Sequence, residues 1–131
     1  MKEIKIGNKK YKLQFGYAVV AKGGIVKNLL EMQDMLDNSD GDMSGVIEKI
    51  MGTLDELLLA ALQKHHSNEF GYSVRTGNGH DEALEKVDDL LDKYFEDENN
   101  DPLALIADLS EELENNGFLR QLLRGADQTT E

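Results

Sequence analysis

The hydrophobic pattern of the chain changes its period near residue 16. Before that point, five apolar side chains alternate with polar ones: Ile4, Ile6, Tyr11, Leu13 and Phe15. Strict alternation places such side chains on one face of a β-strand. The intervening Gly7-Asn8-Lys9 has the composition of a turn. The first 15 residues therefore predict a β-hairpin whose apolar face must pack on the rest of the chain, because a lone hairpin is only marginally stable.

Helical spacing follows from residue 16 to residue 36. Gly23-Gly24 interrupts this segment, which predicts either one helix with a break or two short helices. Residues 37–45 read as a loop by composition, and Ser44 is the expected N-cap of the next helix. A wide apolar stripe then runs from Val46 to Leu62 and predicts the longest and most central helix. That helix is expected to end near His65-His66-Ser67.

The second half of the chain alternates loops and helices. Residues 67–80 contain three glycines and predict a loop with a short extended piece at Tyr72 and Val74. A helix is expected from Asp81 to about Glu96, and the next begins at Asp101-Pro102, which offers an N-cap and an N1 proline. Four leucines and isoleucines form the apolar stripe of that helix: Leu103, Ile106, Leu109 and Leu113. The helix is expected to end at Asn115-Asn116-Gly117, which has the composition of a C-cap.

These elements predict a mainly α (α+β) fold, in which the hairpin packs on a compact bundle of about four to five helices. The 131 residues suit a single domain, 1–131, with a hairpin at 1–15, a helical part at 16–124 and a polar tail at 125–131. A chain of this length can bury a core without a disulfide or a structural metal, and it contains no cysteine.

The net charge of −12 lies in one stretch of the chain. Residues 81–116 hold fourteen acids and two lysines, whereas residues 1–80 hold ten acids and ten bases. Such a surface repels nucleic acid, so direct DNA or RNA binding is not expected. The acids indicate either a solvated helix face or a surface for a basic partner. No apolar run is long enough to span a bilayer, and no membrane partner is expected.

Motifs for catalysis, cofactors and metals are weak in this sequence. Adjacent His65 and His66 point about 100° apart on a helix, and the remaining histidine, His80, is distant in sequence. A calcium-loop pattern covers Asp40, Asp42, Ser44, Gly45 and Ile47, but its twelfth position, which should be a bidentate glutamate, is Met51. Glycine-rich phosphate loops and nucleophile motifs do not occur. We therefore expect no enzyme, no cofactor and no metal.

Candidate binding residues are apolar or basic. Four methionines lie at 32–51 and indicate either core packing or an adaptable binding surface: Met32, Met35, Met43 and Met51. Four apolar residues near the end are hard to bury and suggest a partner-binding patch: Phe118, Leu119, Leu122 and Leu123. A basic N-terminal cluster could pair with the acidic stretch of a second copy, giving a homo-oligomer: Lys9, Lys10 and Lys12.

The order of these patterns resembles a known family. The hairpin segment EIKIGNKKYKLQFGYAVVAK leads into a helix through an aromatic-Gly-aromatic junction. A leucine-rich helix, an acidic helix EALEKVDDLLDKY and a final helix ending NNGF follow. This order resembles the tail assembly chaperones of siphophages that infect Gram-positive bacteria. The resemblance spans nearly the whole chain, and it consists of residue types and their order rather than an invariant signature.

The resemblance implies a protein that acts in the host bacterial cytoplasm and is not part of the mature virion. Members of the family bind the tape measure protein while tail tube protein subunits assemble around it. Many are made in two forms, the longer by ribosomal frameshifting, and this chain would be the short form. The family has no known catalytic residue. The acidic stretch supports an alternative function, an acidic helical regulator or DNA mimic that inhibits a nucleic-acid-binding protein.

Overall fold

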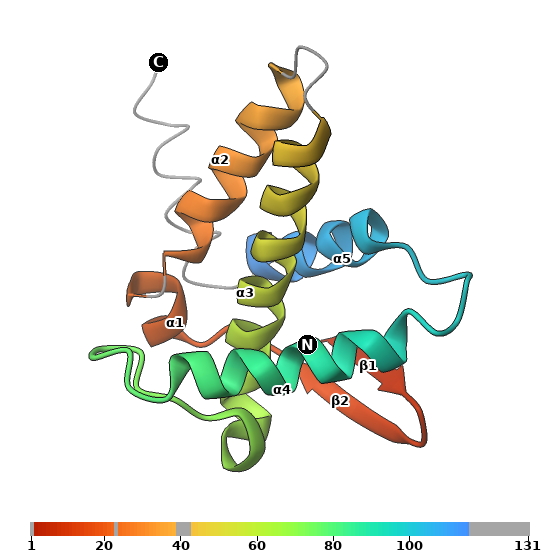
Figure 1. The fold of residues 1–131 in the computed structure, drawn as a ribbon. Coiled ribbons are helices and arrows are strands. Elements are labelled where there is room, and N and C mark those ends of the chain that lie inside the picture. The colour runs from red at the N-terminus through yellow and green to blue at the C-terminus, as the bar shows by residue number, and fades with distance from the viewer. Residues whose placement is uncertain (1, 23, 39–42, 116–131) are drawn as a thin grey trace.

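The computed structural model describes residues 2–22, 24–38 and 43–115, and over these residues it contains a two-stranded sheet and five helices. The elements in chain order are β1 (Lys2–Ile6), β2 (Lys9–Leu13), α1 (Tyr17–Lys22), α2 (Ile25–Asp37), α3 (Met43–Phe70), α4 (His80–Tyr94) and α5 (Pro102–Glu114). Figure 1 shows the remaining elements grouped around α3. The predicted fold class, a hairpin with a mainly helical body, is confirmed.

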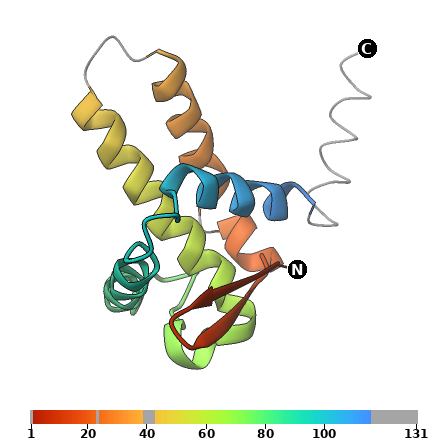
Figure 2. The same cartoon turned by 90° about the vertical axis from the view of Figure 1, so that its right-hand side faces the viewer.

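The hairpin forms where the alternating pattern predicts it. β1 and β2 pair antiparallel with Ile4 opposite Tyr11, and Gly7 takes a φ of 64° in the tight loop between them. Glycine adopts this left-handed conformation without a Cβ clash. The backbone N–H of Gln14 donates to the carbonyl oxygen of Ala61 in α3 at 3.0 Å. The hairpin therefore lies against the C-terminal part of α3 (Figure 2), which covers its apolar face.

Two short helices, rather than one interrupted helix, occupy residues 17–37. α1 ends at Lys22 and α2 begins at Ile25, with Gly24 between them at a φ of 69°. An α-helix requires negative φ, so this glycine separates the two axes. The break predicted at Gly23-Gly24 is confirmed.

The central helix is α3, as its apolar stripe predicted. Six consecutive side chains, Leu57 to Leu62, are each at most 2% exposed. Consecutive positions on a helix differ by 100°, so six of them cover its whole circumference. Neighbours must therefore surround α3 at this level, and α4, α5 and β2 all contact the helix.

The boundaries of α3 differ from those predicted. The helix begins at Met43, so Ser44 lies inside its first turn and is not the N-cap. A serine is tolerated there because the first N–H groups of a helix lack intrahelical acceptors in any case. At the other end, His66 breaks the regular helix with φ −131° and ψ 30°, yet helical structure continues to Phe70. The predicted end marks this break rather than the last helical residue.

The loop after α3 is shorter than predicted and contains no strand. Residues 71–79 form turns, so the extended piece expected at Tyr72 and Val74 is not found. Residue 71, which follows the last helical residue, is a glycine, and a Cβ at this position would collide with the carbonyl oxygen of Ser67. The backbone N–H of Ser73 donates to the carbonyl oxygen of Asn78 at 3.0 Å, which closes the loop on itself.

Helices α4 and α5 begin and end within two residues of the predicted positions. The side chain of Asp101 caps α5, and its Oδ1 accepts a hydrogen bond from the backbone N–H of Leu103 at 3.1 Å. Pro102 occupies the first helical position, as expected. α5 ends at Glu114, and Asn115 follows as its C-cap. The end of the predicted helical part, residues 116–124, lies outside the described residues.

Replacing Asp101 with alanine should lower the free energy of unfolding by about 1 kcal/mol, since an N–H of α5 loses its acceptor. Asp101→Asn keeps a side-chain oxygen at the same place and should change stability by only a few tenths of a kcal/mol. Urea unfolding followed by circular dichroism measures both. Equal losses in the two variants would contradict a capping role.

Candidate binding surface

Large exposed apolar side chains gather where α2 ends and α3 begins. Eight such residues occur within the described ranges: Tyr17, Leu30, Met35, Leu36, Met43, Ile47, Met51 and Leu103. Five of the eight belong to the last turns of α2 or to the first turns of α3. Figure 1 shows that this end of the helix pair extends beyond α4 and the hairpin. A cluster of apolar side chains in such a position is a candidate interaction site.

The N-terminal half of α3 presents an open apolar face, which we call the α3 stripe and define as Met43, Ile47 and Met51. These residues recur every four positions and therefore lie along one side of the helix. They are 54%, 49% and 45% exposed, respectively. Val46 and Ile50, which lie on another side of the same turns, are at most 8% exposed. The wide stripe read from the sequence thus consists of one buried face and one exposed face.

The core interpretation of the methionines is wrong for three of the four. Met32 is 4% exposed, whereas Met35, Met43 and Met51 are between 36% and 54% exposed. α4 and the hairpin lie beside the later turns of α3, so they cover neither its first turns nor the last turns of α2 (Figure 1). Leu103, which was expected on the core-facing stripe of α5, is likewise 48% exposed, and Leu105 is buried instead.

The α3 stripe continues into a groove between α3 and α4, which we call the α3–α4 groove. Seven residues line it: Met51, Leu54, Asp55, Asp88, Leu91, Asp92 and Phe95. The groove has a volume of about 350 Å³. Leu54 and Leu91 are buried and form part of its apolar lining, while three carboxylates supply its charge.

Two of these carboxylates, Asp55 and Asp88, lie close enough to interact electrostatically. Partial burial raises the pKa of Asp55 to about 7, and the hydrogen bond to Asp88 and the negative charges of Asp88 and Glu56 act in the same direction. Near neutral pH Asp55 therefore carries a proton about half of the time. No motif in the sequence singles out these two residues. The available signal was Asp55 itself, an acid placed between Leu54 and Leu57 on an apolar helix.

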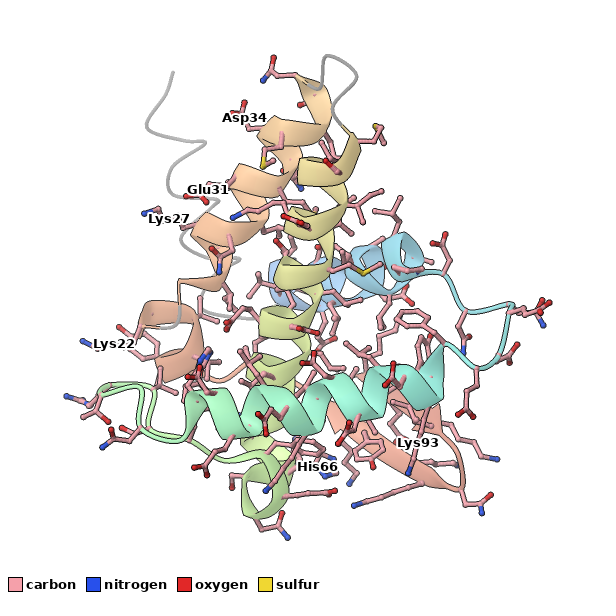
Figure 3. The ribbon with its side chains drawn as sticks, viewed as in Figure 1. Lys22, Lys27, Glu31, Asp34, His66 and Lys93 are labelled. Atoms are coloured by element: carbon pink, nitrogen blue, oxygen red, sulfur yellow. The ribbon has the colours of Figure 1, made fainter. Side chains whose placement is uncertain are left out.

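The three histidines hold segments of the fold together. Each forms a hydrogen bond with a residue distant in sequence. His65 Nε2 bonds to Gln14 Oε1 at 2.8 Å, and His80 Nε2 bonds to Glu56 Oε2 at 3.0 Å. His66 Nε2 accepts a hydrogen bond from the backbone N–H of Lys12 at 2.9 Å. Burial lowers the pKa of His66, whereas the hydrogen bond to Glu56 raises the pKa of His80. Figure 3 shows His66 near the end of α3, beside the hairpin that it binds.

The calcium-loop pattern does not form a loop where the structure describes it. Asp40 and Asp42 lie outside the described residues, and Ser44 to Met51 are helical. A helix separates positions 44 and 51 by about 10 Å along its axis, so they cannot wrap around one ion. Across residues 2–22, 24–38 and 43–115, no group of three histidines or acids is arranged to hold a metal.

The remaining predicted binding residues are only partly placed. The patch of Phe118, Leu119, Leu122 and Leu123 lies outside the described residues. In the basic cluster, Lys9 Nζ bonds to Glu69 Oε2 at 2.8 Å and lies 5.0 Å from the ring centre of Tyr11. Lys10 and Lys12 are exposed. One of the three lysines is thus engaged within its own chain, and self-association through this cluster stays a prediction.

No protein-family model, curated protein or solved structure matches this chain. Within the described ranges, none of the helices has both the length and the apolar character that crossing a bilayer requires.

Proposed function

We propose that this protein is a non-enzymatic tail assembly chaperone of a long-tailed bacteriophage. In this proposal it binds the tape measure protein in the host bacterial cytoplasm, helps recruit tail tube subunits, and is not part of the mature virion. The observation that carries the proposal is the exposed α3 stripe of Met43, Ile47 and Met51. A tape measure chain is helical and apolar until the tube covers it, so its carrier needs an apolar surface that accepts helices.

The α3 stripe has the properties of such a carrier. Its three side chains span about 12 Å along the helix, which is enough to contact two turns of a partner helix. Methionine is flexible and polarizable, so it adapts to an irregular apolar surface. The helix beneath it is held in place, since Val46 and Ile50 are buried and Lys49 Nζ bonds to Glu31 Oε2 of α2 at 2.9 Å.

A chaperone of this kind must also stay soluble while it holds an apolar chain. The net charge of −12 provides repulsion between neighbouring complexes. Most of the charged side chains of α4 are exposed, so they remain available for this purpose when the α3 stripe is occupied. The composition and the surface therefore support the same proposal.

Co-expression with the tape measure protein of the same phage tests the proposal. The unmodified chain should raise the soluble fraction of that protein, and the triple variant Met43→Asp, Ile47→Asp, Met51→Asp should lose most of this effect. The substituted side chains are already exposed, so the variant should still fold. Circular dichroism of the purified variant checks that it does.

Leu30→Asp is the matched control. Leu30 is 59% exposed on α2, three residues after Lys27 and four before Asp34. Figure 3 shows the side chains of Lys27 and Asp34 on the side of α2 away from α3. The Leu30→Asp variant should still raise the soluble fraction of the tape measure protein. Unchanged solubilisation by the triple variant would refute a role for the α3 stripe, and failure of the unmodified chain would refute the proposed function.

A second candidate, an acidic regulator that binds a basic, nucleic-acid-binding protein, is favoured by the outer face of α4. All six acids of this helix are exposed, and four of them lie outside the α3–α4 groove: Asp81, Glu82, Glu85 and Asp89. Binding through such a face weakens steeply as salt is raised, whereas binding through the apolar stripe depends little on salt. A salt titration of the isolated complex separates the two functions.

A further inference from the structure

We propose that the α3–α4 groove and the α3 stripe together hold one amphipathic helix of a partner protein, with a lysine or arginine of that helix between Asp55 and Asp88. The inference deepens the proposed function, on which it rests for the surface that is used. It adds a description of the bound segment, which is a helix with a row of apolar side chains and a basic residue at one end of that row.

The apolar half of this proposal follows from the continuity of the surface. Met51 belongs both to the α3 stripe and to the lining of the groove, so the two form a single strip. Leu54 and Leu91 are at most 7% exposed and Phe95 is half-buried, which makes the groove a socket for an apolar side chain. A helix that lies along α3 would place successive anchors on Met43, on Ile47 and in the groove.

The basic half follows from the charges that line the groove. Among the residues that the structure describes, Asp55, Asp88 and Asp92 are the charged lining residues, and no lysine or arginine lines the groove. The two lysines of α4, Lys86 and Lys93, line a separate hollow beside Glu69 and Phe70. The acids are therefore not neutralised by a basic residue of the groove, and a basic residue of a partner would be attracted to them.

The environment of Asp55 explains why a cation fits between the two acids. Asp88 and Asp92 face it from α4, and Glu56 contributes negative charge from α3 while bonding to His80. Near neutral pH the pair lowers its repulsion by retaining a proton. A lysine or arginine relieves the same repulsion, so binding should release that proton and should strengthen as pH rises from about 6 to 8.

Two synthetic helical peptides test this inference with the full-length protein. Both carry leucines at i, i+4 and i+8, and they differ at one terminal position, which is lysine in one peptide and the uncharged norleucine in the other. Fluorescence anisotropy at pH 8 should show binding of the lysine peptide about tenfold tighter than that of the norleucine peptide. The preference should shrink at pH 6.

Variants assign the preference to the groove. Asp55→Asn with Asp88→Asn should bind both peptides equally, at the affinity of the norleucine peptide. Met51→Asp should weaken both, and Leu30→Asp should change neither. The affinity of each peptide for the unmodified chain, measured by the same anisotropy experiment, is the reference for each variant.

The possible failures are distinguishable. Equal binding of both peptides to the unmodified chain overturns the basic occupant but leaves the apolar surface, and so the proposed function, intact. No binding of either peptide overturns the docking inference, and the co-expression result then decides the proposed function alone. If Met51→Asp instead converts a dimer into a monomer on a sizing column, the occupant is a second copy of this chain and the inference is wrong.

Discussion

Replacing Leu58 with alanine should lower the free energy of unfolding by about 3 to 4 kcal/mol. Leu58 is fully buried in the part of α3 that other elements surround on all sides. Such a site cannot collapse easily around a smaller side chain, so the loss of burial and the remaining cavity both contribute. The shift of the urea midpoint, at an unchanged slope, measures the effect.

Ile47→Ala is the matched control on the same helix. Its side chain is 49% exposed, so truncation should cost less than about 1 kcal/mol. A loss as large as that of Leu58→Ala would mean that the α3 stripe is covered in the folded protein in solution. That result would contradict the open surface on which both proposals depend.

Features with local causes were predictable from the sequence. The alternation of Ile4 and Ile6 with charged residues defines a strand without reference to any other segment. The Asp101-Pro102 pair determines a helix start through its own side-chain oxygen and fixed φ. Gly24 ends one helix and precedes the next because of its own backbone conformation. Each signal and its effect lie within a few residues of one another.

The exposure of the α3 stripe was not predictable in this way. Helical periodicity indicates that Met43, Ile47 and Met51 share a face, but it does not say which neighbour covers that face. Val46 and Ile50 carry the same signal and are buried. The difference depends on where α2 and α4 lie, which is a tertiary property. The same holds for the Asp55–Asp88 pair, whose members come from different helices.

Replacing Asp55 with asparagine should stabilise the protein at pH 8 by about 1 to 2 kcal/mol. In the folded state the pKa of Asp55 is raised to about 7, whereas an unfolded aspartate has a pKa of about 3.9. The folded state therefore binds more protons between these values, and Asp55 makes stability fall as pH rises from about 4 to about 7. Solvent screens this half-buried group, so the expected effect is well below the full electrostatic value.

Urea unfolding of Asp55→Asn and of the unmodified chain at pH 4.5, 6 and 8 measures this difference, which should be smallest at the lowest pH and largest at the highest. Asp92→Asn removes the same charge from the same groove and is the control for net charge; it should give a smaller and flatter difference. The histidines are present in every variant, so their contributions to the pH dependence largely cancel. A difference that does not grow with pH would refute the raised pKa of Asp55.

If the difference does grow with pH, Asp55→Asn should be more stable and yet bind the lysine peptide more weakly. The reason is that the repulsion between the acids, which destabilises the folded chain, is the interaction that a basic partner relieves.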